Sequence, residues 1–292
     1  MKSLRWAVSG LALAVISAAC GNGQPPRQAT PAPTDLPSPG GGETTTVTIY
    51  YLIESETRMW LAPERHEVPD QAGIGRAALQ ELIAGDAQDQ DHFTPLPPDT
   101  EILDLTIEDG LATVDWSADV LEASVGAEGE SLGIQSVVWT LTEFPTVDQV
   151  QFTVEGKSEG EASNGRVIED WWGHVGLGDQ PFTRAESFEV LEPITIWTPL
   201  DGDEVGTEFT VEGAACTFEA NVPIRIFNEA GDHVQTEVTT ALSACPDRGE
   251  FTLEIVIEDP PSSPEVWGIE AYESSADTGE DTFVQSRRII VG

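Results

Sequence analysis

The sequence predicts an α+β domain of the split βαβ kind, followed by an all-β sandwich. Over about residues 46–190, alternating strand patterns are interrupted by two stretches with the apolar spacing of helices. Over about residues 191–292, seven short runs follow one another with turns between them and without any helical period. Residues 1–45 carry neither pattern. They divide into a signal-like stretch over 1–19 and a linker that starts at Cys20.

The N-terminus has the features of a secretion signal. Lys2 and Arg5 precede an apolar run over 6–16, which is too short to span a bilayer permanently. Small residues then lead to Cys20, and the stretch resembles a bacterial lipobox, with Ser17 where leucine is most usual. The resemblance implies cleavage before Cys20, a diacylglycerol on its thiol and acyl chains, such as palmitate, that anchor the chain in a membrane. The alternative is an ordinary signal peptide with a chance cysteine.

The segment after Cys20 has the composition of a flexible tether. Residues 21–46 are rich in Pro, Gly, Ser and Thr and nearly devoid of large apolar side chains, so they cannot bury a core. Behind a lipidated cysteine, such a tether would hold a folded part away from the membrane surface. A disordered tail without a spacing role predicts the same composition.

The first domain opens with a strand and a helix. Residues 47–52 are β-branched and aromatic, which is typical of a strand. A helix is expected from about Gln71 to Ala84, with Asp70 as its N-cap and Gly85 just past its end. Its apolar face consists of Ile74, Ala78, Leu79 and Leu82.

A hairpin turning at Asp109-Gly110 forms the centre of this domain. Asp-Gly between alternating runs favours a type I′ turn, because that turn needs positive φ at both central residues. The faces that we expect to be apolar are Leu103, Leu105 and Ile107 on the first strand and Ala112, Val114 and Trp116 on the second.

A second helix and a last strand follow the hairpin. The helix has one apolar stripe and ends before Pro145, and the strand over 149–154 alternates apolar and polar residues. The order β-α-β-β-α-β predicts a small sheet covered on one face by helices. The stripe consists of Ile134, Val137, Val138 and Leu141, and the buried strand face of Val150, Phe152 and Val154.

Four segments of this domain, taken in order, resemble a known family. They are VTIYYL (47–52), GRAALQELIAG (75–85), LPPDTEILDLTIEDGLATVDWS (96–117) and ESLGIQSVVWTLTEFPTVDQVQFTVEGK (130–157). Together they are similar to the GerMN domain of bacterial sporulation and germination lipoproteins. That family resembles the ring-building modules of secretion and sporulation complexes, which implies protein–protein assembly or scaffolding and not chemistry.

Residues 158–190 show many turn formers and no clear period, and they hold Trp171, Trp172 and His174. One interpretation is a long loop that folds its tryptophans back onto the domain or packs them between domains. The other is an aromatic patch, formed by Trp171 and Trp172, for a sugar, peptidoglycan or protein partner.

The second domain is expected to be an antiparallel β-sandwich. Two of its runs alternate cleanly with polar residues, at 251–257 and 267–271. The seven expected strands are 194–197, 209–212, 222–227, 234–240, 251–257, 266–272 and 283–291.

The run over 198–231, TPLDGDEVGTEFTVEGAACTFEANVPIRIFNEAG, resembles the immunoglobulin-like domain that accompanies GerMN in spore-germination proteins. The shared pattern is a Pro-x-x-Gly turn, a strand ending in Val-x-Gly-x-Ala, then Phe-Glu-Ala and a strand closed by a glycine turn. The resemblance implies a role in adhesion, spacing or partner binding.

Two cysteines remain once Cys20 is assigned to lipid. Cys216 and Cys245 both fall in the sandwich, and a disulfide is allowed in an exported chain. Closing a loop of this length would stabilise the fold by about 3 to 4 kcal/mol in the chain-entropy model. A metal site is the weaker alternative, because neither cysteine belongs to a Cys-x-x-Cys or Cys-x-x-His pair.

Charge excludes one class of partner. The net charge is −39, with Lys2 and Lys157 the only lysines, so the phosphate backbone of nucleic acids would be repelled. The acidity is explained either by solubility or by a surface that attracts cations or a basic partner, and the sequence does not decide between these.

The sequence holds no catalytic or cofactor-binding motif that we recognise. The four histidines form no His-x-x-x-His pair, and there is no Gly-x-Ser-x-Gly elbow or Walker loop. Residues 201–204, Asp-Gly-Asp-Glu, lack the spacing of a calcium loop and indicate a solvated turn.

Two hypotheses follow. The first is a non-enzymatic, lipid-anchored envelope protein on the extracytoplasmic side of the cell membrane, which contacts an envelope or membrane protein or associates with itself. The second is a surface protein that binds or processes cell-wall glycans such as peptidoglycan, with Trp171, Trp172 and nearby carboxylates at its site.

Overall fold

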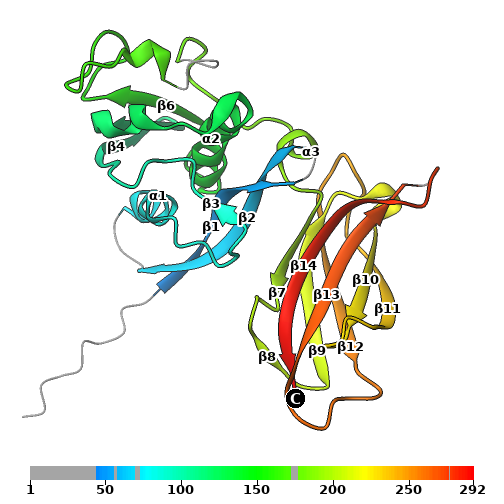
Figure 1. The fold of residues 1–292 in the computed structure, drawn as a ribbon. Coiled ribbons are helices and arrows are strands. Elements are labelled where there is room, and N and C mark those ends of the chain that lie inside the picture. The colour runs from blue at the N-terminus through cyan, green and yellow to red at the C-terminus, as the bar shows by residue number, and fades with distance from the viewer. Residues whose placement is uncertain (1–43, 56–57, 70–72, 172–176, 276) are drawn as a thin grey trace, which may run out of the picture. The chain divides into compact units, whose positions relative to one another are not determined.

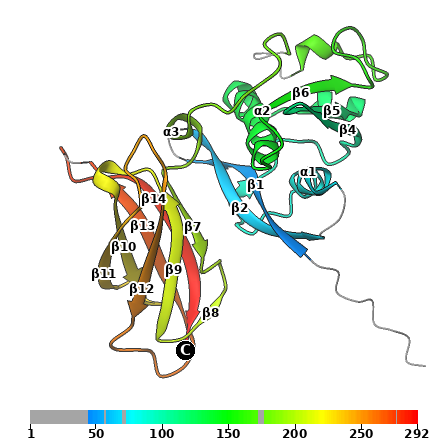
Figure 2. The ribbon, with the colours of Figure 1, turned by 180° about the vertical axis from the view of Figure 1, so that it is seen from behind.

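The structure is a computed structural model that describes residues 44–55, 58–69, 73–171, 177–275 and 277–292 (Figures 1 and 2). The predictions for the signal, Cys20, most of the linker, Asp70 and Trp172 lie outside these residues. Within the ranges given, no helix is long and apolar enough to cross a membrane.

The first part of the described chain contains two three-stranded sheets where the sequence predicted one. β1 lies between β2 and β3, and β5 lies between β4 and β6. Both edges of β1 are occupied by strands that the pattern analysis did not predict, so β1 does not join the second sheet. The elements are β1 (Thr44–Glu54), β2 (Met59–Pro69), α1 (Ile74–Ala84), β3 (His92–Phe93), β4 (Ile102–Glu108), β5 (Leu111–Trp116), η1 (Ala118–Glu122), α2 (Gly126–Thr142), β6 (Gln149–Val154), η2 (Ile168–Asp170) and α3 (Ser187–Val190).

The predicted helices and their apolar faces are confirmed. α1 and α2 each contact strands of both sheets, and one core joins them (Figure 1). α1 begins at Ile74, after Gly73, and ends with Gly85 at φ 69°, whose N–H donates to the carbonyl of Glu81. α2 connects the parallel strands β5 and β6, which makes a βαβ unit. The α+β class is therefore as predicted, while the sheet arrangement differs.

The Asp-Gly turn is also as predicted, but one face of the hairpin is not. Asp109 and Gly110 have φ of 51° and 85°, as a type I′ turn requires. Leu103 and Ile107 are nevertheless 46% and 41% exposed. A β-bulge between Ile102 and Asp104 shifts the register of β4, and Ile102 and Leu105 are the β4 residues that pack against the core. The partner strand is buried at Ala112, Val114 and Trp116.

The second part of the described chain is a β-sandwich, and all seven predicted strands are present. A five-stranded sheet, β11-β10-β13-β14-β8, faces a three-stranded sheet, β12-β9-β7, across one apolar core (Figure 2). Gly213 on β9 allows close packing there, because a Cβ would lie 2.1 Å from the carbonyl oxygen of Thr195. The elements are β7 (Ile194–Thr198), β8 (Glu204–Val205), β9 (Glu208–Ala215), η3 (Phe218–Ala220), β10 (Asn221–Phe227), β11 (His233–Thr240), β12 (Gly249–Val256), β13 (Glu265–Ser274) and β14 (Asp281–Val291).

Candidate functional site

The two sandwich cysteines are joined in the structure. Cys216 follows β9, Cys245 lies in the loop before β12, and their Cα atoms are 4.5 Å apart. The bridge therefore closes the stretch that contains β10 and β11. The same loop reaches the segment that precedes β7, since the Ser187 hydroxyl donates to the carbonyl of Pro246 at 3.4 Å.

Trp171 is not available as a surface platform. Its side chain is 1% exposed, and its ring meets Phe152 edge-on, with the ring centroids 5.1 Å apart. The proposed aromatic patch is therefore wrong for this residue, because the loop after β6 folds its tryptophan into the core. The other interpretation, a loop that packs its tryptophan back onto the domain, describes Trp171. Trp172 and His174 lie outside the described residues.

The structure instead brings together a buried set of ionisable side chains around Glu64. Glu64 and His66 lie on β2 and His92 on β3, and all three are less than 9% exposed. Nε2 of His66 and Nδ1 of His92 lie 2.9 and 2.6 Å from the Glu64 carboxylate. Because a carboxylate only accepts, both ring nitrogens donate. The backbone N–H groups of Gln88 and Asp89 donate to the same carboxylate at 2.7 and 3.0 Å.

These four hydrogen bonds set the charge of the cluster. Burial alone would raise the pKa of Glu64, but the donors outweigh it and hold that pKa at about 2. Burial alone would lower the pKa of His92. The hydrogen bond that His92 donates to Glu64 and the charges of Glu192 and Asp89 outweigh it, so the pKa of His92 is raised. Glu64 is thus ionised, and the raised pKa of His92 favours the protonated imidazolium, whose positive charge balances the Glu64 carboxylate.

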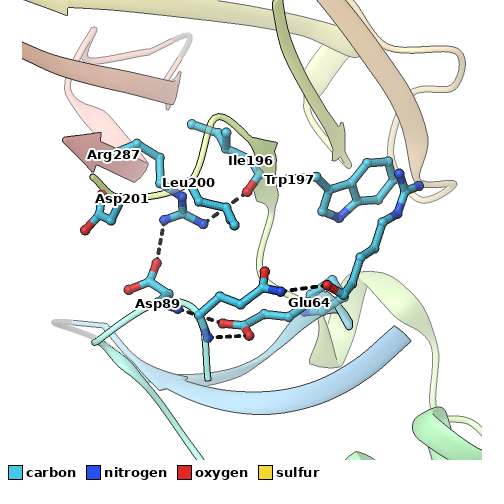
Figure 3. A pocket seen from close by; sticks show the side chains of 10 residues that line it. Glu64, Asp89, Ile196, Trp197, Leu200, Asp201 and Arg287 are labelled. Carbon is cyan, nitrogen blue, oxygen red and sulfur yellow. Dashed lines mark hydrogen bonds and ion pairs between the residues drawn. The ribbon is translucent and has the colours of Figure 1, made fainter. Parts of the chain in front are cut away.

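An ion pair extends this cluster to the last strand (Figure 3). The guanidinium of Arg287 on β14 donates to the carboxylate of Asp89, and the two side chains are 4% and 10% exposed. A second nitrogen of Arg287 donates to the carbonyl of Ile196 on β7 at 3.0 Å. Arg287 therefore ties the loop before β3 to both sheets of the sandwich.

A small hollow lies beside this ion pair, lined by Glu64, Leu200, Asp201 and Trp197 among others (Figure 3). The guanidinium of Arg65 lies over the Trp197 ring, 3.6 Å from its centroid, which is a cation–π contact. The carboxylate of Asp201 accepts from the N–H of Arg288 at 2.6 Å. The predicted turn at 201–204 thus uses its carboxylates to bind backbone.

A second buried cation holds the segment between the two parts. Arg248 donates to the carbonyls of Glu192, Pro193 and Ala214 and to the hydroxyl of Thr195. Glu192 is fully buried, and burial raises its pKa while the charges of His92, Arg248 and Arg287 oppose the rise. Arg248 lies three residues after Cys245, just outside the loop that the disulfide closes.

The arrangement is suited to holding segments of the chain together. The carboxylates of Glu64 and Asp89 are occupied by hydrogen bonds from the chain itself. Across the part of the chain that the structure describes, no group of three or more His, Cys, Asp or Glu side chains could hold a metal ion. We refer to Glu64, His66, Asp89, His92 and Arg287 as the junction cluster.

Sequence reasoning missed the junction cluster. Its members lie between 2 positions (66 − 64) and 223 positions (287 − 64) apart in the sequence, and no sequence motif contains them. The sequence of β2 held one signal of a strand, because Glu64, His66 and Val68 alternate with other residues after the apolar pair Leu61-Ala62. Pro63 lies within the same run, and a proline argues against a strand.

Two family models match this chain. Residues 48–160 match the family described as "Germane: Sporulation and spore germination", and residues 193–280 match "Gmad2: Immunoglobulin-like domain of bacterial spore germination". The chain carries a Germane domain followed by a Gmad2 domain. Both resemblances noted in the sequence are confirmed.

This chain also has a curated relative. The spore germination protein GerM of Bacillus subtilis (strain 168) is 32% identical over 122 residues, which cover 39% of this chain. The match spans about a third (32%) of that relative's length.

Solved structures show weaker likenesses. The tandem GerMN domains of the sporulation protein GerM from Bacillus subtilis are 26% identical, with a TM-score of 0.39, over 53% of this chain and 49% of that one. A putative lipoprotein from Clostridium perfringens is 19% identical, with a TM-score of 0.33, over 48% and 87%. These scores are too low to carry an argument about function.

The junction cluster lies across the two domains. Glu64, His66, Asp89 and His92 belong to the Germane match, while Ile196, whose carbonyl accepts from Arg287, belongs to the Gmad2 match. Arg287 falls seven residues beyond the end of the Gmad2 match at 280, although β14 pairs with β13 along its length. β14, whose Arg287 contacts Asp89 of the Germane match, is thus a strand of the sandwich.

Proposed function

We propose that this chain is a non-enzymatic, lipid-anchored protein of the bacterial cell envelope that acts as an interaction or assembly module. The observation that carries the proposal is the junction cluster. Its Asp89–Arg287 pair joins the Germane and Gmad2 domains, and its Glu64 carboxylate is occupied by four donors of the chain itself. Two domains held by directional contacts suit a module that presents its surfaces to other proteins.

The membrane anchor rests on the N-terminal residues. A short apolar run and small residues precede Cys20, as in bacterial lipoproteins, and residues 21–46 have the composition of a tether. The Cys216–Cys245 bridge fits a compartment outside the cytoplasm, where disulfides persist. We therefore place the folded domains on the extracytoplasmic side of the cell membrane.

The anchor can be tested by labelling. Cells that produce the full-length chain are fed labelled palmitate, and the protein is followed through membrane fractionation. The Cys20→Ala variant should lose both the label and the membrane association, whereas Ser17→Leu, which restores the usual lipobox residue, should keep both. A Cys20→Ala protein that still carries the lipid label would refute the anchor.

The interaction role needs a separate measurement. Crosslinking of the full-length protein in its native host, read by mass spectrometry, should yield crosslinks either to itself or to an envelope or membrane protein. Crosslinks mainly to itself indicate a self-assembling module, and crosslinks to one membrane protein indicate an accessory subunit. If neither type forms, the proposed role is wrong.

The glycan hypothesis loses one of the two tryptophans that motivated it. It depended on Trp171 and Trp172 beside acids, and Trp171 is buried against Phe152, while Trp172 lies outside the described residues. We therefore do not carry it further as a function of this chain.

A further inference from the structure

A groove of about 1260 Å³ lies beside the junction cluster. Glu54, Trp60, Asp91 and Phe93 line it from the Germane domain, and Glu273 and Phe283 line it from the Gmad2 domain. Pockets for small molecules typically enclose about 300 to 1000 Å³. This groove is larger, so it suits a segment of polypeptide better than a small ligand.

The groove is negative because its carboxylates outnumber its nearby cations. The lining holds five acidic side chains and no Lys or Arg. Two of the five carboxylates form ion pairs, Asp89 with Arg287 and Asp281 with Arg225. For Glu54, Asp91 and Glu273, no ion pair occurs within the described ranges, although Glu273 accepts from the N–H of Phe218 at 2.9 Å. Three uncompensated carboxylates therefore face one groove.

Aromatic side chains lie among these carboxylates. Trp60, Phe93 and Phe283 are each half-buried, so part of each ring remains accessible. The guanidinium of Arg58 already lies 4.0 Å from the centroid of the Trp60 ring, which shows that this ring accepts such a cation. Carboxylates interleaved with aromatic rings recognise Arg and Lys side chains through charge and cation–π contacts together.

Charge also argues against a second copy of the chain as the occupant. With a net charge of −39, two copies repel each other, and a copy offers few basic side chains to this groove. A basic segment of a different protein meets no such opposition.

We propose that this groove binds an extended, Arg- or Lys-bearing segment of a partner protein. The proposal rests on the interaction role given above and specifies the surface and the chemistry of the partner. Carboxylates from both domains hold the basic side chains, and the aromatic rings cover their aliphatic stems. Binding is therefore salt-dependent, because most of these charges remain in contact with solvent.

The test uses the full-length chain in nonionic detergent and a fluorescein-labelled nonapeptide of alternating arginine and leucine. Fluorescence anisotropy should detect binding of this probe and none of the matched peptide with glutamate in place of arginine. The variant Glu54→Lys/Asp91→Lys should weaken binding about tenfold, because each reversal replaces an attraction by a repulsion. The milder Glu54→Gln/Asp91→Asn variant should give an intermediate loss.

A matched control separates the groove from the overall charge. The variant Glu237→Lys/Glu254→Lys changes the net charge equally at exposed positions on β11 and β12, away from the groove. It should weaken binding less than about threefold. Equal losses in the two Lys variants would show that overall charge alone attracts the probe and would overturn the proposal, as would the absence of binding. Unchanged circular dichroism shows that each variant is folded.

Crosslinking in the host distinguishes this proposal from the proposed function. If the wild-type chain crosslinks to a partner and Glu54→Lys/Asp91→Lys abolishes those crosslinks, both hold. If the crosslinks persist in that variant, the groove assignment fails while the interaction role stands. If no crosslinks form even with the wild type, the interaction role fails as well.

Discussion

Replacing Glu64 by glutamine should destabilise the protein in a pH-dependent way. The carboxylate accepts four hydrogen bonds, two on each oxygen, from His66, His92, Gln88 and Asp89. A glutamine offers one acceptor oxygen, so its NH₂ group would face two donors. Two of the four bonds are lost in a site where Glu64 is 5% exposed.

The magnitude follows from the pKa of Glu64, which falls from 4.5 to about 2 on folding. A shift of this size corresponds to about 3 kcal/mol of stability. Because the folded pKa is depressed, this contribution is present above the unfolded pKa and is lost as the pH falls through the folded pKa. The gap between wild type and Glu64→Gln should therefore be about 3 kcal/mol at pH 7 and about 1 kcal/mol at pH 3.

Urea denaturation of both proteins at pH 7, 5 and 3 measures this gap. Glu108→Gln, at an exposed position on β4, serves as the control and should change the free energy of unfolding by less than about 0.5 kcal/mol at every pH. A gap for Glu64→Gln that is the same at pH 3 and pH 7 would refute the reasoning, because the charge of the carboxylate would then play no part.

An NMR titration of His92 gives a second, independent reading. Its pKa is raised in the folded protein despite burial, with the Glu64 hydrogen bond as the largest raising contribution. The stabilisation from His92 is therefore complete below its unfolded pKa and is lost as the pH rises through the folded value. In Glu64→Gln the pKa of His92 should fall, and an unchanged value would contradict the assigned contact.

Three further predictions concern the connections within the fold. Arg287→Leu should lower the free energy of unfolding in urea by about 3 to 5 kcal/mol, because it leaves Asp89 buried without its cation. Adding Asp89→Asn should recover most of this stability. Equal losses in the single and double variants would contradict the prediction. Reducing the disulfide should lower the free energy of unfolding by about 3 to 4 kcal/mol, measured with and without reductant, and no change would rule out its stabilising role. Gly213→Ala should cost about 1 to 3 kcal/mol from overpacking, while Gly206→Ala, where a Cβ meets nothing nearer than 3.8 Å, should be nearly neutral; similar losses in the two would show that close packing is not the cause.

Local patterns predicted most of the secondary structure because burial and periodicity agree there. β12 and β13 alternate between buried and more exposed positions, and one face of α2 is apolar at helical spacing, so each of these elements could be inferred from its own residues. β2 failed this test, because its buried positions include Pro63, Glu64 and His66. In a pattern analysis, charged residues indicate an exposed position. Glu64 and His66 are nevertheless buried, because β3 and the loop before it supply hydrogen-bond partners.

The tertiary contacts could not be predicted for the same reason. Trp171 and its neighbour stand among acids and turn formers, which is typical of an exposed loop, yet Trp171 packs against Phe152 of β6. Likewise, Arg287 alternates with apolar residues on a strand, and nothing local indicates that it meets Asp89. Both contacts join residues at least 19 positions apart, as 171 − 152 shows, and depend on how the strands are placed.

The polar character of the junction cluster bears on what the protein does. Each domain has an apolar core of its own, and neither core needs buried charges to form. Burying ion pairs adds little stability compared with apolar packing, because desolvation offsets most of the attraction. Such contacts demand particular distances and directions, however, whereas apolar surfaces tolerate sliding. The Asp89–Arg287 pair therefore favours one relation between the Germane and Gmad2 domains. That relation brings Glu54 and Asp91 opposite Glu273, so the contacts that join the domains also form the groove proposed to receive a basic partner.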